Sequence, residues 1–167
     1  MDGKAYAEKD FVENPVKYGT TPEVIEYVKK TRNLVEDITQ FLCTHADELE
    51  SMDVVVPDIN IKGRLWKQIA EAAPDVYITS SVRQLIEISD KNAGKHTGLR
   101  FVTKLLGISM RDVAAFGDGD NDMEMLRMAG CGYAVANASD QCKEAADHIV
   151  GHHDADGVGK AILELLK

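Results

Sequence analysis

Three carboxylates and one amide lie within five consecutive residues, Asp118 to Asp122, in the second half of the chain. A short apolar run at residues 113–116 precedes them, and glycines at positions 117 and 119 allow a tight turn. Crowding like charges in this way is unfavourable unless a cation binds there. Carboxylate and amide oxygens suit Mg²⁺, which takes one or two carboxylates together with water and a substrate phosphate. The loop therefore predicts a magnesium site, in preference to a solvated turn whose acids only cap the next helix.

Two other ligand-binding loops fit this stretch poorly. A calcium-binding EF-hand loop counted from Asp118 would need glycine at its sixth position and glutamate at its twelfth, where the chain has Met123 and Ala129. The dinucleotide-binding pattern G-x-G-x-x-G begins at Gly117 but ends on Asp122, whose charge would repel a pyrophosphate. The sequence excludes both.

The elements around the acidic loop alternate between strand and helix patterns. Strands are predicted at Val113–Phe116, Tyr133–Ala136 and Ile149–Val150, and helices at His96–Leu106, Met123–Met128, Asp140–Ala146 and Gly157–Leu166. Such alternation is typical of parallel βαβ units. Ligands bind at the carboxyl ends of the strands in these sheets, and the acidic loop follows the first of the three strands.

The first half of the chain mixes helix and strand patterns less regularly. Strands are predicted at Lys4–Ala7, Met52–Val56, Val76–Ile78 and Leu85–Ile88, and helices at Pro22–Thr31, Leu34–His45 and from Ile61 to about Pro74. The whole chain is therefore predicted to be an α/β protein.

Residues 117–126, Gly-Asp-Gly-Asp-Asn-Asp-Met-Glu-Met-Leu, resemble the GDGxNDxxML signature of the haloacid dehalogenase (HAD) superfamily, in its branch of Cof-type phosphatases with a type IIB cap. Residues 133–138 and 156–158 are similar to that branch as well, and residues 93–98 are similar to the segment that carries its third-motif lysine. The resemblance implies the C-terminal half of a Rossmann-like, parallel-sheet HAD core over residues 85–167. Residues 1–84 resemble part of the α/β cap domain, which selects the substrate in this branch.

The resemblance also implies roles for individual residues. Asp118 would ligate Mg²⁺, with Asp122 as a second metal ligand or as a partner of the first. Asn121 would hydrogen-bond the phosphoryl group, and Lys95 would hold a phosphate oxygen, so that Lys95 and Asp118 form the catalytic set. Asp120 is expected to be exposed without a fixed role. The implied reaction is Mg²⁺-dependent hydrolysis of a phosphoric monoester of a small metabolite, with sugar phosphates as the expected class.

One part of the family pattern has no match in these residues. The D-x-D-G-T loop, whose first aspartate attacks phosphorus, is missing: no Asp-x-Asp-Gly-Thr sequence occurs in the chain, and the D-x-D sequences within residues 118–122 belong to the later acidic loop. Without that carboxylate no aspartyl-phosphate can form. We therefore expect a fragment of a longer enzyme that is inactive alone, and that forms a homodimer or associates with the missing N-terminal half. The alternative is a non-catalytic Mg²⁺- or phosphate-binding module, or a subunit that needs a partner chain.

The chain is acidic, with 19 lysines and arginines against 28 aspartates and glutamates and a formal charge of −9. This charge repels phosphate backbones and anionic lipids, so nucleic-acid and membrane partners are not expected. The three cysteines form no C-x-x-C pair, no apolar run reaches the ~18 residues of a membrane span, and the first residues do not resemble a signal peptide. A cytoplasmic protein is predicted. His152, His153 and Asp154, with His148 nearby, are expected to be solvated rather than to bind a metal.

Overall fold

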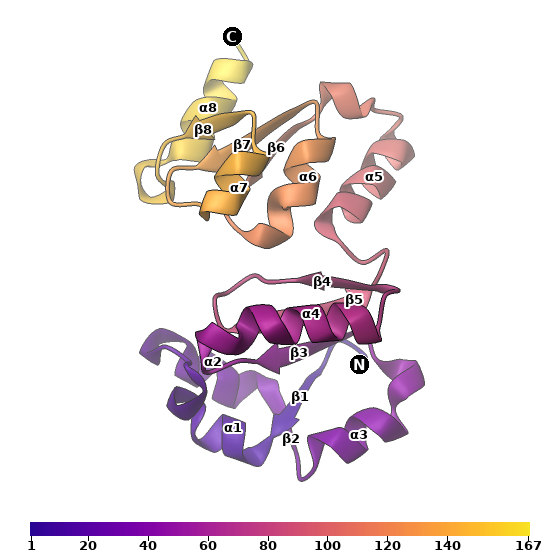
Figure 1. Cartoon of the computed structure of the whole chain (residues 1–167). Coiled ribbons are helices and arrows are strands. Elements are labelled where there is room, and N and C mark those ends of the chain that lie inside the picture. Colours follow the sequence, from indigo (N-terminus) through magenta and orange to yellow (C-terminus); the bar gives the residue numbers. More distant parts are fainter. The chain divides into compact units, whose positions relative to one another are not determined.

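The computed structural model describes residues 1–167, which fold as two compact units. The first unit comprises Met1–Ile78 and Arg83–Asp90, and the second comprises Thr79–Val82 and Lys91–Lys167 (Figure 1). Both units combine helices with sheets, so the predicted α/β class is confirmed. None of the helices is both long enough and apolar enough to cross a membrane.

The first unit contains two small sheets. Its helices and strands are β1 (Ala5–Glu8), α1 (Lys9–Glu13), α2 (Pro22–Thr31), β2 (Arg32–Val35), α3 (Ile38–Thr44), β3 (Ser51–Val55), α4 (Lys62–Ala72), β4 (Val76–Thr79, of which all but the last residue fall in this unit) and β5 (Leu85–Asp90). Strands β1 and β2 pair in parallel. The other sheet has the strand order β3-β5-β4, and its strands β3 and β5 are antiparallel.

The core of the first unit forms where α4 packs on the three-stranded sheet (Figure 1). Val56 is 2% exposed and Ile86 is fully buried. Leu65, Trp66 and Ile69 recur at helical spacing along α4 and pack against these two side chains and their neighbours. The apolar stripe that predicted this helix is therefore its core-facing side.

The prediction of a helix from Leu34 to His45 is wrong over its first residues. Residues 32–35 form strand β2 instead, paired in parallel with β1. Helix α3 begins only at Ile38, where the carboxylate of Asp37 accepts a hydrogen bond from the N–H of Gln40 at 2.9 Å. Pairing with β1 satisfies the backbone of a segment whose local pattern fits a helix, and the Asp37 cap delays the helix start.

A charged network fixes the turn that follows α1. The carboxylate of Asp10 accepts hydrogen bonds from Lys17 Nζ at 2.6 Å, from Asn14 Nδ2 at 2.9 Å and from the hydroxyl of Tyr18. The bond from Lys17, followed by those from Tyr18 and Asn14, lowers the pKa of Asp10 from 3.8 to about 2. Because this pKa is lowered, the ionised carboxylate stabilises the turn fully above pH 3.8, and the stabilisation is lost as the pH falls from 3.8 through about 2.

Replacing Lys17 with methionine should therefore raise the pKa of Asp10 towards its ordinary value of 3.8. An NMR titration that follows the carboxyl carbon of Asp10 measures this directly. Lys9→Met is the matched control, because Lys9 pairs with Glu13 at 3.8 Å. If Lys17→Met left the pKa of Asp10 unchanged, the lysine would not be the main cause of the shift.

The second unit is a regular parallel α/β arrangement. It contains α5 (Lys95–Leu106), β6 (Ala114–Gly117), α6 (Met123–Met128), β7 (Cys131–Val135), α7 (Asp140–Ala145), β8 (His148–Val150) and α8 (Gly157–Leu165). The strand order is β6-β7-β8, and both strand pairs are parallel. The elements predicted for this half are confirmed, with bounds that differ by at most two residues from those predicted.

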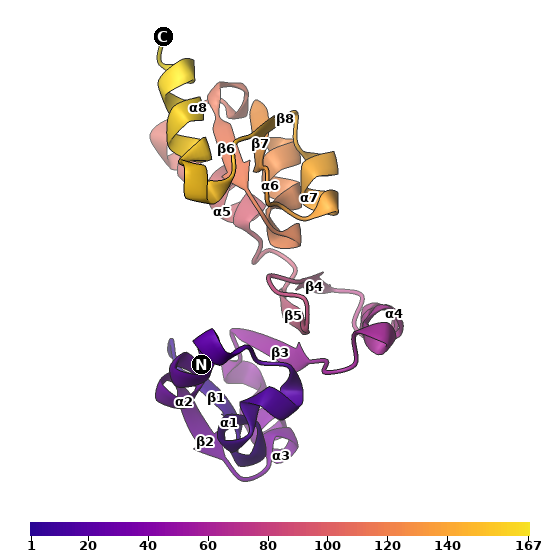
Figure 2. The same ribbon diagram turned by 90° about the vertical axis from the view of Figure 1, so that its left-hand side faces the viewer.

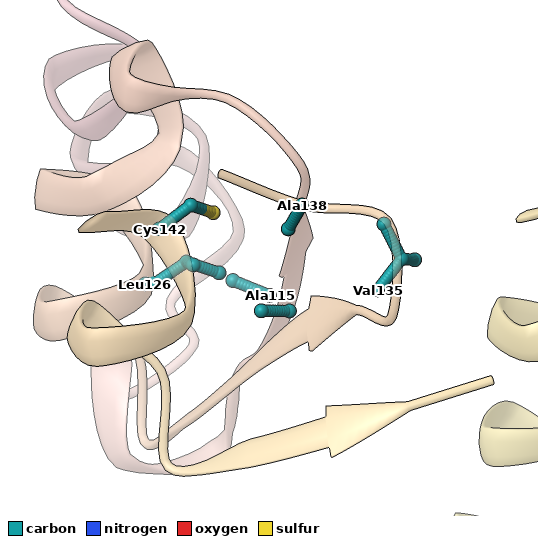
Figure 3. Close-up of a cluster of buried hydrophobic side chains, with 6 residues drawn as sticks. Ala115, Leu126, Val135, Ala138 and Cys142 are labelled. Carbon is teal, nitrogen blue, oxygen red and sulfur yellow. The ribbon is translucent and has the colours of Figure 1, made fainter. Parts of the chain in front are cut away.

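Helices α6 and α7 cover one side of this sheet, and α8 lies on the other side (Figure 2). The cluster beneath α6 and α7 includes Leu126, which is 1% exposed, and the fully buried Ala134 and Cys142. Figure 3 shows Leu126 and Cys142 directed into this cluster beside Ala115. Burial, followed by the nearby carboxylates, with Asp122 first among them, raises the pKa of the Cys142 thiol to about 11. Cys142 is therefore a neutral core residue.

Gly157 starts α8 at a point where the chain passes close to itself. A Cβ atom at this position would lie 1.9 Å from the carbonyl oxygen of Gly151. Gly157→Ala should therefore destabilise the second unit by about 3 kcal/mol, because the backbone must shift to relieve the overlap. Thermal unfolding measures the loss. Gly98→Ala, within α5, is the control: its Cβ would meet no atom within 4 Å, and it should stabilise the helix by about 0.5–1 kcal/mol. Equal stability of the two variants would contradict the prediction.

Candidate metal and phosphate site

The acidic loop follows β6 directly and leads into α6. Residues 120–122 form a single 3-10 turn, and α6 continues from it without a break. Lys95, the first residue of α5, reaches this loop with its ammonium group. The structure thus brings Lys95 to Asn121 and Asp122, more than twenty residues later in the sequence, at the carboxyl end of β6.

Asp122 is the buried carboxylate of the loop, with 2% of the residue exposed. Its Oδ2 accepts hydrogen bonds from the backbone N–H of Asp118 at 2.9 Å and of Gly119 at 3.1 Å, and its Oδ1 accepts one from Lys95 Nζ. Burial alone would raise the pKa of Asp122, but the hydrogen bonds from Lys95 and the two N–H groups outweigh it, and the pKa lies below its ordinary value. Both oxygens are engaged by the protein, an arrangement that suits an anchoring partner better than a direct metal ligand.

The glycine at the end of β6 makes room for this carboxylate. A Cβ atom on Gly117 would lie 2.5 Å from the Cβ of Asp122, too close for any side chain. Glycine at position 117 therefore leaves space for the side chain of Asp122. This role adds to the tight turn for which the sequence analysis singled out the glycine.

Lys95 and Asn121 place hydrogen-bond donors together. The side chain of Lys95 is 48% exposed, and its Nζ donates to Asp122 Oδ1 and, at 3.4 Å, to Asn121 Oδ1. With its carbonyl oxygen turned towards the lysine, Asn121 keeps its amide NH₂ to donate to a ligand. An ammonium and an amide NH₂ on the same side of a loop are suitable donors for phosphate oxygens.

Asp118 has the opposite environment from Asp122. The residue is exposed, and its carboxylate takes no hydrogen bond or ion pair within the chain. Its backbone is fixed, since its N–H donates to Asp122 and its carbonyl oxygen accepts from the N–H of Ser139 at 3.0 Å. A free carboxylate on a fixed backbone fits Mg²⁺, which needs only one or two carboxylates and fills its other positions with water and phosphate.

The environment of Asp120 differs from the one expected from the sequence. The residue was expected to be exposed, but it is half-buried, and its Oδ1 accepts a hydrogen bond from the hydroxyl of Ser139 at 2.6 Å. Ser139 was missed as a member of the site. The sequence could have predicted it as the N-cap of the helix that starts at Asp140, but not its contact with a loop that precedes it by a whole helix and strand.

The histidine pair on the loop before α8 is exposed, as expected. Ligand atoms of His152, His153 and Asp154 lie within 4.8 Å of one another, without His148. They already contact each other: Asp154 Oδ1 lies 2.8 Å from His153 Nε2, and the N–H of Asp154 donates to His152 Nδ1. The cluster is a group of mutually paired surface side chains.

A parallel α/β sheet that carries a free carboxylate, an amide and a lysine at the end of one strand is typical of proteins that handle phosphoryl groups. The family model for haloacid dehalogenase-like hydrolases matches residues 3–162, and the chain belongs to this family. The resemblance predicted from residues 117–126 is thereby confirmed.

Several similar proteins carry phosphatase names. A phosphoglycolate phosphatase of Archaeoglobus fulgidus is 44% identical over 75 residues, which cover 45% of this chain and 34% of that protein. The 5-amino-6-(5-phospho-D-ribitylamino)uracil phosphatase YbjI of Escherichia coli is 33% identical over 144 residues, 86% of this chain and 49% of that one. The structure of the HAD subclass IIB sugar phosphatase BT4131 shares the fold, with a TM-score of 0.71 and 23% identity over 87% of this chain and 55% of that one. The chain thus spans half or less of the length of these two curated relatives.

Proposed function

We propose that this chain contains the metal- and phosphate-binding part of a Mg²⁺-dependent phosphatase. The enzyme would act on a small phosphorylated metabolite, with sugar phosphates as the expected class. The observation that carries the proposal is the free, exposed carboxylate of Asp118 in the loop where Lys95 and Asn121 present their donors. A phosphoric monoester brings a doubly charged group that needs a cation and several hydrogen-bond donors. The phosphatase names of the relatives support the same class of reaction.

Each side chain of the site has a separate task in this proposal. Asp118 would hold Mg²⁺, and the bound ion would offset negative charge on the phosphoryl group. Lys95 and Asn121 would bind and orient phosphoryl oxygens. Asp122 keeps the ammonium of Lys95 at the loop through its hydrogen bond, and it also fixes the backbone that carries Asp118.

The nucleophile would be the carboxylate of a D-x-D-G-T loop outside these residues, brought to the site by an associating segment or a second chain. The 167 residues alone should therefore be inactive. We also propose that the first unit forms part of the cap domain that selects the substrate. The three free cysteines suit a protein that works in the reducing cytoplasm.

Hydrolysis of an aryl phosphate, with and without Mg²⁺, tests the proposal. It is measured for the 167-residue chain alone and for the longest open reading frame that contains it. We expect turnover only from a longer product that includes a D-x-D-G-T loop, and only with Mg²⁺ present. Turnover by the chain alone that needs both Mg²⁺ and Asp118 would show that another carboxylate acts as the nucleophile.

The alternative is a non-catalytic module that binds Mg²⁺ or phosphate, favoured by the absence of a D-x-D-G-T match in these residues. This alternative gains support if the open reading frame holds no such loop and its product binds Mg²⁺ but hydrolyses nothing. The presence of the loop in frame, with turnover, rejects it.

A further inference from the structure

Ser139, at the start of α7, contacts the acidic loop at two points. Its backbone N–H donates to the carbonyl oxygen of Asp118 at 3.0 Å, and its hydroxyl donates to Asp120 Oδ1 at 2.6 Å. It lies on a different connection of the sheet, the one between β7 and α7. Ser139 does not itself bind the metal or the phosphoryl group in the proposed function.

Ser139 is itself firmly held. As the N-cap of α7, its hydroxyl accepts a hydrogen bond from the N–H of Cys142 at 3.1 Å. Its neighbour Ala138 is 5% exposed, and Cys142 is fully buried in the core cluster shown in Figure 3. The packing of these neighbours in the core therefore fixes the position of the Ser139 hydroxyl, which in turn hydrogen-bonds the acidic loop.

Two residues, Asp122 and Ser139, hold the backbone of Asp118 through hydrogen bonds. The buried Asp122 accepts hydrogen bonds from the N–H groups of Asp118 and Gly119. From the start of α7, Ser139 donates hydrogen bonds to the carbonyl oxygen of Asp118 and to the side chain of Asp120. The bond to Asp120 also keeps this second carboxylate directed at Ser139, which leaves Asp118 as the free carboxylate among the three acids of the loop.

We propose that Ser139 is a positioning residue for the metal site, which fixes the loop through Asp120 so that the Asp118 carboxylate is already placed to receive Mg²⁺. The inference rests on the proposed function, since it assumes that Asp118 binds the metal. Partners outside the ligand shell typically change metal affinity by 10–100-fold, because they remove the cost of ordering the ligands. The structure assigns this task to a hydroxyl supplied by another part of the fold.

Calorimetric titration of the whole chain with MgCl₂ alone tests the proposal. Ser139→Ala should weaken Mg²⁺ binding by about 10-fold, and Ser139→Thr, which keeps a hydroxyl, should restore it. Asp120→Ala should weaken binding to a similar extent. In the Asp120→Ala background, Ser139→Ala should cause no further loss of Mg²⁺ affinity, yet it should still lower the unfolding midpoint by about 3 °C through the lost helix cap.

These measurements separate positioning from a merely structural role. Wild-type Mg²⁺ affinity in Ser139→Ala overturns the inference and leaves the proposed function standing. A full loss of affinity from Ser139→Ala in the Asp120→Ala background also overturns it, since the effect would then act through α7. If the unaltered chain bound no Mg²⁺, both the proposed function and this inference would fail.

Discussion

Asp118→Asn should remove Mg²⁺ binding from the chain while leaving its stability unchanged. The carboxylate makes no contact within the protein, so its loss breaks no hydrogen bond or ion pair. The backbone bonds of residue 118 to Asp122 and Ser139 do not involve the side chain and are retained. We expect Mg²⁺ affinity to fall by about 100-fold or more, because the carboxylate that we propose as the metal ligand becomes neutral. The free energy of unfolding should change by less than about 0.5 kcal/mol.

Calorimetric Mg²⁺ titration and thermal unfolding of the same preparation check both halves of this prediction. Glu144→Gln is the matched control, because it removes one negative charge from an exposed position on α7. It should leave both Mg²⁺ affinity and stability near those of the unaltered chain. Undiminished Mg²⁺ binding in Asp118→Asn would place the metal elsewhere, and a loss of more than about 1 kcal/mol in stability would mean that the carboxylate has a structural partner.

The local signals in the second half of the sequence were sufficient to predict its elements. Gly107 ends α5 in the left-handed conformation, and the apolar runs of β6, β7 and β8 are separated by helices of ordinary pattern. Helix α6 has the predicted bounds, Met123–Met128. In the first half, β2 could not be predicted because its formation depends on β1, more than twenty residues earlier, and not on its own sequence.

The acidic loop could be predicted as a candidate site, but the different environments of its three acids could not be predicted from the sequence. Asp118, Asp120 and Asp122 alternate along the chain and look equivalent. In the structure one is free, one accepts from a serine hydroxyl, and one is buried against a lysine. What distinguishes them is the direction in which each side chain points from a tightly turned backbone. That direction is set by contacts with α5 and α7, which lie outside the loop.

Asp122→Ala should produce the opposite result from Asp118→Asn: a large loss of stability in the second unit. The substitution removes the acceptor for the N–H groups of Asp118 and Gly119 and the charged partner of Lys95. Two buried or half-buried backbone donors would lose their bonds, so we expect a cost of about 3 kcal/mol. Hydrogen exchange at the amides of β6 and β7 measures it locally. The single tryptophan, Trp66, belongs to the first unit, so its fluorescence reports whether that unit is unaffected.

Lys95→Met separates the ion pair from the backbone bonds of Asp122. The lysine side chain is half exposed, and Asp122 keeps two N–H donors without it, so the variant should cost only about 1 kcal/mol. Because Lys95 acts on stability through Asp122, adding Lys95→Met to Asp122→Ala should cost almost nothing more. Strictly additive losses would show that the two side chains stabilise the unit independently. Losses of stability that are not additive would instead mean that Lys95, the proposed phosphate ligand, is held in place by the Asp122 carboxylate. This is the same carboxylate that fixes the backbone of Asp118.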